Sequence, residues 1–334
     1  MLRLVFMGSD PIALPALDWL AGEGSELADL VGVFTQPDRA TGRGQKVQAN
    51  EIKLWAQARG LPVFQPAKVG AAEREQLAAL QPDLNLVMAY GHILRQEFID
   101  TPRRGTLNLH TSILPVYRGA SPIQTAVACG DRETGVTLMR MVLKLDAGPV
   151  AGVERVGIGP LDTAAEVAAE LARACVPLLA RCLPAIGEGV QAFAAQAEAA
   201  ATYCRRHEKS DGVLDFAAPA AGLAARINGL TPWPGCTVMI AGQTVKLGQA
   251  DVCHLLYDKG LGVGPGEVVG TDAEGLLVAT GQGVLRLRKL QRPGGRMLAA
   301  TEFLRGFPVA PGTCLPSSPM PPLVARDPFP RPKV

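Results

Sequence analysis

The 334-residue sequence lacks the motifs that mark several large enzyme classes. It has no G-x-G-x-x-G run, and the turn after the first apolar segment, Gly8-Ser9-Asp10-Pro11, has a single glycine, which argues against dinucleotide binding. The Walker A pattern of nucleotide-triphosphate sites and the G-x-S-x-G elbow of many hydrolases are absent as well. A reaction centre must therefore be built from other residues.

Cysteine and histidine are too scattered to predict a metal site or a disulfide framework. The seven cysteines include no C-x-x-C pair, and the chain has four histidines. The apolar N-terminal run, residues 1–8, has neither a basic leader nor a cleavage signal and is typical of a buried first strand. No apolar run reaches membrane-spanning length. We therefore expect a cytoplasmic protein with reduced cysteines and no metal.

The formal net charge of +2 is unevenly distributed. Residues 1–200 carry 18 basic against 21 acidic side chains, a net of −3, whereas residues 201–310 carry 12 against 9, a net of +3. Residues 311–334 add 3 against 1, a net of +2. A basic second part favours contact with a polyanion, and chance explains so small an imbalance about equally well.

Strand-like and helix-like periods alternate through the first 185 residues, which predicts an α/β fold with a Rossmann-like, doubly wound parallel sheet. The expected strands are 2–7, 29–34, 62–64, 84–89, 106–110 and 135–142. The expected helices are 9–19, 50–59, 71–80, 121–128 and 162–183, the last with a kink or break at Pro177.

The composition then changes, which predicts a catalytic domain over 1–188 and a linker over 189–205. Short strands punctuated by glycine follow within 206–308 and predict a small OB-like β-barrel. The proline-rich end, 309–334, predicts a mostly disordered tail. The expected strands of the barrel are 236–240, 244–247, 266–271, 275–280 and 283–290.

The strand 106–110 ends on two polar side chains of one face, Asn108 and His110. Asp146 follows the strand 135–142, and in a parallel sheet its carboxylate would reach the same edge as His110. A carboxylate beside an imidazole favours the charged ring and fixes its tautomer. An amide and an imidazolium can both donate to the oxyanion of an acyl transfer, and an amine acceptor needs no serine or cysteine nucleophile.

Each of these three residues also has an ordinary structural explanation. An asparagine at a strand end is often a cap, a lone histidine is often a core residue, and an aspartate before Ala-Gly is often a turn residue. Three such coincidences at one sheet edge are less probable than any one of them, so the pattern favours acyl transfer.

Three segments resemble the signature of the folate-dependent formyltransferases: Asn108-x-His110, Ser112-Ile113-Leu114-Pro115-x-Tyr117-Arg118-Gly119 and Leu145-Asp146-x-Gly148. The similarity covers about residues 2–308, and the segments 32–39 and 232–234 match the family members that act on methionyl-tRNA. The resemblance implies transfer of the formyl group of 10-formyltetrahydrofolate, a co-substrate, to the amine of methionyl initiator tRNA for translation initiation. Asn108 and His110 would hold the oxyanion, and Asp146 would orient and charge His110.

The resemblance also implies binding residues. Those expected to contact the folate are Ser112, Ile113, Leu114, Pro115, Ala89, Tyr90 and Gly91. Those expected to contact tRNA are Arg39, Arg43 and Lys46 in the glycine-rich loop 35–47, and Arg286, Arg288 and Lys289 in the second domain. The expected protein is a monomer that does not bind membranes.

Three other functions suit the same residues: formyl transfer to a small amine (glycinamide ribonucleotide or an amino sugar), hydrolysis of the formyl-folate, and RNA binding without catalysis. A small acceptor needs neither the basic loop 35–47 nor a basic second domain, so these favour tRNA. The complete set of Asn108, His110 and Asp146 argues against an inactive protein.

Overall fold

The structure is a computed structural model that describes residues 1–41, 44, 46–254 and 263–330. It divides into two compact units. The first comprises Met1–Arg118, Gly135–Val156 and Ala168–Ala201, and the second comprises Gly119–Thr134, Gly157–Val167 and Thr202–Val334. Two short stretches from the first half of the chain therefore belong to the second unit.

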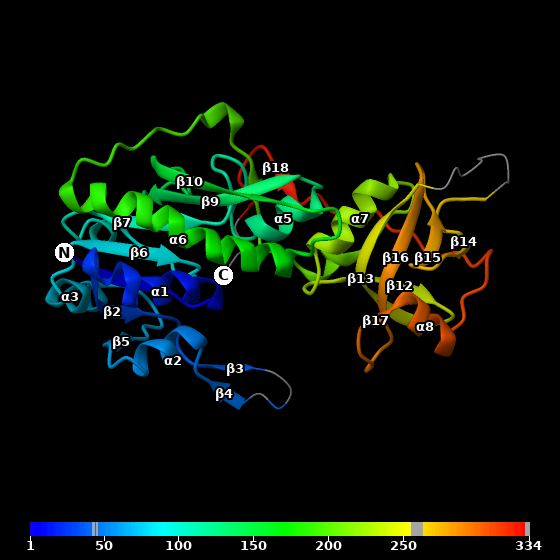
Figure 1. Cartoon of the computed structure of the whole chain (residues 1–334), viewed down its shortest axis with the longest axis horizontal. Helices are drawn as coiled ribbons and strands as arrows, with labels where there is room; N and C mark the ends of the chain where they lie inside the picture. The colour runs from blue at the N-terminus through cyan, green and yellow to red at the C-terminus, as the bar shows by residue number, and fades with distance from the viewer. Residues whose placement is uncertain (42–43, 45, 255–262, 331–334) are drawn as a thin grey trace. The chain divides into compact units, whose positions relative to one another are not determined.

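The first unit contains a seven-stranded sheet in the order β10-β9-β7-β6-β1-β2-β5 (Figure 1). Its strands are β1 (Leu2–Gly8), β2 (Ala28–Phe34), β5 (Val63–Phe64), β6 (Leu84–Met88), β7 (Thr106–His110), β9 (Glu133–Arg140) and β10 (Val150–Gly157). The pairs from β5 through β2, β1 and β6 to β7 are parallel, as predicted. The prediction is wrong for β9, which runs antiparallel to β7, and β10 was not predicted.

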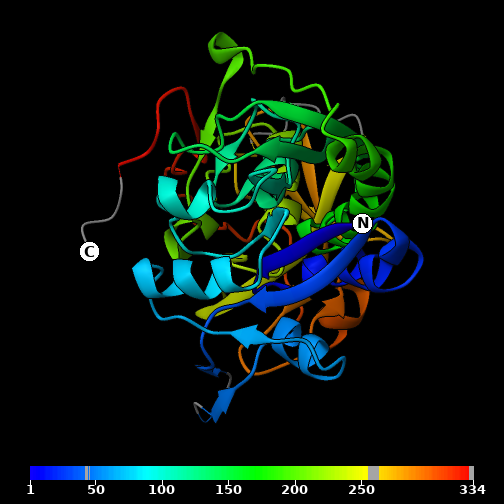
Figure 2. The ribbon, with the colours of Figure 1, turned by 90° about the vertical axis from the view of Figure 1, so that its left-hand side faces the viewer.

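Helices cover both faces of this sheet, which confirms the doubly wound fold. Figure 2 shows α3 (Ala71–Ala79) on one side of the central strands and α1 (Leu14–Ala21) and α6 (Ala164–Glu188) on the other. Alternate strand residues meet the two layers: Val87 packs in one cluster with Leu77 of α3, whereas Met88 lies with its sulfur 4.0 Å from Cys175 of α6. The remaining helices of this part of the chain are α2 (Glu51–Gln57), α4 (Gln96–Ile99) and α5 (Pro122–Ala128).

Helix α6 is continuous, so the expected break at Pro177 is absent. Both Pro177 and Pro184 lie inside it. A proline removes one backbone hydrogen bond, but burial of an apolar face holds the helix together around it. Leu171, Leu178 and Leu179 are fully buried and provide that face.

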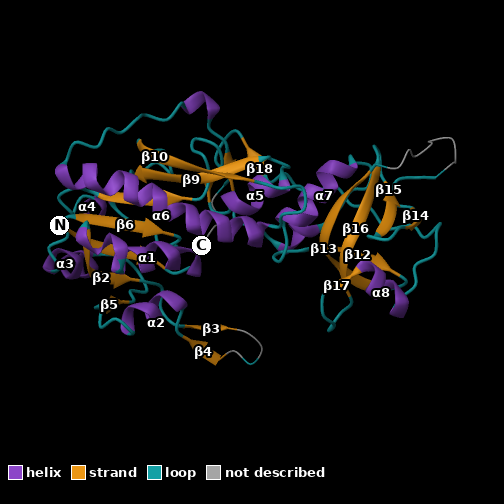
Figure 3. Cartoon of the chain, viewed as in Figure 1, coloured by secondary structure: helices purple, strands orange, loops and turns teal. Residues whose placement is uncertain are grey.

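The second unit contains an antiparallel sheet in the order β12-β13-β16-β15-β14, with β17 beside β16 (Figure 3). The strands are β12 (Cys236–Ile240), β13 (Gln243–Cys253), β14 (Val268–Thr271), β15 (Leu276–Ala279), β16 (Val284–Gln291) and β17 (Leu298–Ala299). The sequence predicts a small OB-like β-barrel in this range, and the β-domain is confirmed, with its strands paired antiparallel. Two helices were not predicted, α7 (Ala220–Gly229) and α8 (Ala300–Gly306), and both contribute buried side chains to the core of this unit.

The proline-rich tail differs from the expected disordered segment, because residues 309–330 follow a defined path over the second unit. Strand β18 (Val324–Ala325) pairs with β11 (Tyr203–Cys204). The backbone N–H of Leu315 donates to the carbonyl of Gly266 at 2.7 Å, and the guanidinium of Arg226 donates to the carbonyl of Pro321 at 3.0 Å. Extended proline-rich chain has no apolar period of its own, so its order depends on partners that a local pattern does not reveal.

Deletion of residues 309–334 is expected to destabilise the protein. The tail buries Leu315 and Leu323, which are 4% and 5% exposed, and each such leucine contributes about 1.5–3 kcal/mol. We expect the midpoint of thermal unfolding to fall by about 5–15 °C, measured by calorimetry. Asp327→Ala, at an exposed residue of the same tail, is the control and should leave the midpoint unchanged. Equal midpoints for the truncated protein and the Asp327→Ala protein would show that the packed tail contributes no stability.

Candidate active site

The site is centred on the end of β7. Asn108 and His110 share one face of this strand, as predicted, while their neighbour Leu109 is buried on the other. His110 is 6% exposed, whereas Asn108 is half-buried. Within the described part of the chain, no hydrogen bond involves the Asn108 side-chain amide. Its two N–H donors are therefore available to a substrate.

Asp146 lies beside His110, but a loop places it there and not the end of a neighbouring parallel strand. Because β9 runs antiparallel to β7, its last residue, Arg140, lies opposite Leu107 rather than at the His110 end. The loop between β9 and β10 brings the carboxylate back, and Asp146 Oδ2 lies 3.8 Å from His110 Nδ1. The expected pair is thus formed by a returning loop and not by neighbouring strand ends.

Two acceptors flank the His110 ring. Nε2 lies 2.9 Å from the carbonyl oxygen of Tyr117, which can only accept, so this nitrogen carries a proton in that contact. Nδ1 faces the Asp146 carboxylate. At 3.8 Å this second contact is within ion-pair distance but beyond hydrogen-bond length, so the ring has a hydrogen-bond acceptor on one side and a carboxylate on the other.

Strained backbone is concentrated around these residues. Five non-glycine residues of the described chain have positive φ, and three of them belong to the predicted site or flank it: Ala89 (48°), Tyr117 (59°) and Asp146 (47°). Left-handed backbone costs a residue with a Cβ about 1–2 kcal/mol, and such strain persists where surrounding contacts hold it. Its clustering here supports a functional assignment for this region.

The Ser112–Pro115 loop is held by internal hydrogen bonds. The Ser112 hydroxyl donates to Val116 O at 2.5 Å, and the Ser112 backbone carbonyl accepts from the Thr137 hydroxyl at 2.6 Å. The Thr137 hydroxyl in turn accepts from Leu114 N at 3.1 Å. Ser112 and Leu114 are buried, whereas Ile113 and Pro115 are half-buried. The first pair therefore fixes the loop, and the second pair is the part that a ligand could contact.

The turn after β6 contains the other predicted folate residues. Ala89 and Gly91 (φ 77°) are exposed and in left-handed conformations, and the Ala89 carbonyl accepts from Ser9 N at 3.2 Å, beside the end of β1. Tyr90 between them is 3% exposed, and its hydroxyl has no hydrogen-bond partner among the described residues. Burial raises the pKa of the Tyr90 hydroxyl, so it stays protonated and can donate.

The predicted basic loop is described in part. Arg39 and Lys46 lie on β3 (Arg39–Thr41) and β4 (Lys46–Gln48), which form a hairpin, and both side chains are exposed. Arg39 Nη2 donates to Gln36 Oε1 at 2.6 Å. Arg43 falls outside the described residues.

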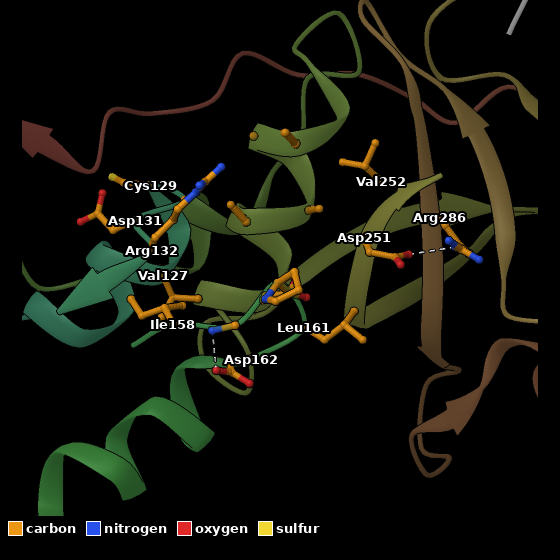
Figure 4. A pocket seen from close by; sticks show the side chains of 18 of the residues that line it. Val127, Cys129, Asp131, Arg132, Ile158, Leu161, Asp162, Asp251, Val252 and Arg286 are labelled. Atoms are coloured by element: carbon orange, nitrogen blue, oxygen red, sulfur yellow. Dashed lines mark hydrogen bonds and ion pairs between the residues drawn. The ribbon is translucent and has the colours of Figure 1, made fainter. Parts of the chain in front are cut away.

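The basic side chains of β16 are not an open cationic face. Arg286 donates to Asp251 at 2.9 Å and to Asp272 at 3.1 Å, and it also contacts Glu274, as does Arg288 (Figure 4 shows the Asp251 contact). Nearby carboxylates raise the pKa of Arg286 above its usual value despite the opposing effect of burial. Lys289 differs from these two arginines because its side chain is exposed. It pairs with Gln249 of β13, where the register of the two strands shifts.

A cavity of about 770 Å³ lies in the second unit, lined in part by α5, α7 and β13 (Figure 4). Arg286 is the only predicted site residue among its lining residues. The lining carries side chains of both charges, including Arg132, Asp131 and Asp162, among several small and apolar residues. The cavity therefore adds nothing to the Asn108–His110–Asp146 set.

Burial keeps two of the cysteines neutral, and the described residues contain no metal-ligating cluster. Burial raises the pKa values of Cys175 and Cys236 to about 12, so these thiols stay protonated. Among the described residues, no cluster of three or more His, Cys, Asp or Glu side chains could hold a metal ion. Within the same part of the chain, none of the helices is both long and apolar enough for a membrane crossing.

Two segments of this chain match the sequence patterns of known protein families. The sequence pattern of the family described as "Formyl transferase" matches residues 2–183, and that of "Formyl transferase, C-terminal domain" matches residues 206–308. The chain belongs to the formyl transferase family. The two matched ranges of this formyl transferase lie within the segments 1–188 and 206–308.

Relatives of this formyl transferase match it along nearly its whole length. The methionyl-tRNA formyltransferase of Methylococcus capsulatus is 40% identical over 310 residues, which cover 92% of this chain and 98% of that protein. The enzyme of the same name from Bordetella bronchiseptica is 41% identical over 317 residues, with 92% and 99% covered. A solved N-formyltransferase from Helicobacter canadensis, in complex with folinic acid and dTDP-3-aminofucose, has the same fold, with a TM-score of 0.65 at 16% identity, covering 87% of this chain and 100% of that one.

Sequence patterns of this formyl transferase do not reveal one polar contact beside the candidate site. The side-chain amide of Gln196 contacts backbone carbonyls of the loop that holds Asp146. It lies in the segment predicted as a linker, where composition is the only local signal, so neither periodicity nor a motif could have found it.

Proposed function

We propose that this chain transfers the formyl group of 10-formyltetrahydrofolate to the α-amine of methionyl initiator tRNA, giving N-formylmethionyl-tRNA. The observation that carries the proposal is the 40% identity, over 92% of the chain, to a relative named methionyl-tRNA formyltransferase. The geometry supports it independently, because a free amide donor, a flanked imidazole and a carboxylate gather at one site.

The chemistry is an acyl transfer between two nitrogens. The amine attacks the formyl carbon, a C–N bond to methionine forms, and the C–N bond to the folate nitrogen breaks. Asn108 and the His110 imidazolium stabilise the negative charge that develops on the formyl oxygen. For this, His110 Nε2–H exchanges the Tyr117 carbonyl, 2.9 Å away, for that oxygen. Asp146 holds the ring and accepts the amine proton through water, and the folate nitrogen receives a proton in return.

The residues present fit a folate. The unpartnered Tyr90 hydroxyl is a buried donor in the turn after β6, and a ligand with a polar ring edge would satisfy it. Ala89 and Gly91 expose backbone on either side of it, and Ile113 and Pro115 offer apolar contact from the end of β7. We propose that these residues and their neighbours Ser112 and Leu114 form the folate pocket.

The tRNA contacts are also a proposal. The exposed side chains of Arg39 and Lys46, together with Arg43, would bind phosphates near the charged end of the tRNA, and Lys289 would bind them from the second domain. Arg286 and Arg288 can do so only by exchanging their carboxylate partners for phosphate. We further propose that the enzyme acts as a monomer in the cytoplasm.

A panel of acceptors tests the proposed function. Purified enzyme with 10-formyltetrahydrofolate is given methionyl-tRNA, uncharged tRNA, glycinamide ribonucleotide, a nucleotide-linked amino sugar, or no acceptor. We expect formylated product with methionyl-tRNA alone. Product with a small amine, or release of formate without an acceptor, would assign the site to one of the alternative reactions.

A further inference from the structure

The Asp146 loop is held in a conformation that its own sequence does not favour. Asp146 has a φ of 47°, in the left-handed region that a side chain with a Cβ rarely occupies. Two residues on, the backbone passes so close to Arg140 that a Cβ at Gly148 would lie 1.7 Å from the Arg140 carbonyl oxygen. Such a loop keeps its shape only when surrounding contacts hold it.

Gln196 makes those contacts. Its Nε2 donates to the carbonyl of Asp146 at 2.8 Å and to the carbonyl of Gly148 at 2.7 Å. These two bonds span the strained turn from one side to the other. Both N–H groups of the amide are therefore used on the loop that carries the catalytic carboxylate.

The oxygen of the same Gln196 amide accepts two hydrogen bonds from Arg118. Gln196 Oε1 accepts from Arg118 Nη2 at 2.8 Å and from Arg118 Nε at 3.1 Å. The Arg118 side chain is completely buried and also pairs with Glu198 at 3.0 Å. Lys144, on the Asp146 loop, pairs with the same carboxylate at 2.5 Å. Gln196 and Glu198 thus each bridge Arg118 to this loop.

Arg118 directly follows Tyr117, whose carbonyl accepts from His110 Nε2. One side of the His110 ring is therefore set by the residue before Arg118, and the other side by Asp146. Gln196 is the side chain that joins Arg118 to the backbone of Asp146. This junction therefore links the backbone that carries one acceptor of the imidazole to the backbone that carries the other.

We propose that Gln196 is a positioning residue of the reaction: it locks the Asp146 turn to Arg118 and so keeps the carboxylate on His110. The proposal rests on the proposed function. It assigns a catalytic duty to a segment, residues 189–205, whose composition predicts only a linker. A small displacement of a catalytic group lowers the rate of the chemical step more than it lowers substrate affinity.

Kinetics of three variants test the proposal. Gln196→Ala removes all four hydrogen bonds, whereas Gln196→Glu keeps the acceptor for Arg118 and loses the donors to the two loop carbonyls. Gln191→Ala is the matched control, since Gln191 lies in the same segment and its amide also donates to two backbone carbonyls, those of Ala151 and Ala192.

Both Gln196 variants are expected to lower kcat by about 10–100-fold, the range for losing an outer partner of a functional group, with KM for either substrate within about twofold. Gln191→Ala should keep kcat within about twofold of the parent protein. A parent-like kcat in Gln196→Glu would overturn the proposal, because the contact with Arg118 alone would then suffice. A raised KM at unchanged kcat would overturn it too.

A spectroscopic measurement separates this proposal from the proposed function. The chain has four histidines, so the imidazole signals in a ¹H–¹⁵N spectrum without substrate can be assigned by single substitution. We expect the His110 signal to shift in both Gln196 variants and to stay in place in Gln191→Ala. An unmoved His110 signal would overturn the positioning role. A parent protein that fails to formylate methionyl-tRNA while the His110 signal still responds would instead overturn the proposed function.

Discussion

The His110→Ala variant is expected to formylate methionyl-tRNA with kcat lowered by about 10²–10⁴-fold, the range for loss of a positioned proton donor. The ring lies on the same strand face as Asn108, and its removal also takes away the contact with Asp146. Binding of tRNA should be nearly unchanged, because the 6%-exposed side chain cannot contact much of a macromolecule. Initial rates and a tRNA binding isotherm measure the two effects.

His254→Ala is the control for this variant. His254 is an exposed histidine of the second unit that takes no part in the proposed reaction, and its removal should leave kcat unchanged. If His110→Ala formylates methionyl-tRNA at near the parental rate, the imidazole does not stabilise the developing charge.

Removal of the Asn108 amide should lower kcat by about 10²–10³-fold, as loss of one oxyanion donor does in other acyl transfers. Asn108→Ala loses the donor, and Asn108→Asp replaces it with a negative charge of nearly the same shape. The aspartate variant should be the slower of the two, because its charge repels the oxyanion. Rates under single-turnover conditions isolate the chemical step.

The midpoint of thermal unfolding shows whether the lower kcat of Asn108→Ala comes from the lost amide or from a destabilised protein. The Asn108 amide has no hydrogen-bond partner within the described residues, so Asn108→Ala leaves no partner unsatisfied. Its midpoint of thermal unfolding should stay within about 2 °C of the parent, a shift of less than about 1 kcal/mol. A stable Asn108→Ala protein with parental kcat would remove Asn108 from the mechanism.

The reaction centre could be predicted from sequence where its residues share one local element. Asn108 and His110 lie two apart on a single strand, and the period of two that places them on one face is local information. The parallel core was predicted for a similar reason, because continuous apolar runs such as Leu84–Met88 mark strands that are buried on both faces.

The features that could not be predicted depend on contacts between distant segments. The antiparallel direction of β9 follows from where its chain returns, which the apolar run itself does not encode. The sequence around Arg286 and Arg288 does not indicate that these side chains pair with Asp251 and Glu274, which lie elsewhere in the chain. Gln196 acts on a turn 50 residues away, and only the folded backbone brings the two together.

The most direct measurement follows a ¹⁴C-labelled formyl group from 10-formyltetrahydrofolate in a single turnover with methionyl-tRNA. The label is predicted to appear on the α-amine of methionine, recovered as N-formylmethionine after the tRNA ester is hydrolysed. The parent and Gln191→Ala proteins should transfer it at similar rates, and His110→Ala should leave it on the folate. Label recovered as free formate, or remaining on the folate with the parent protein, would contradict the proposed reaction.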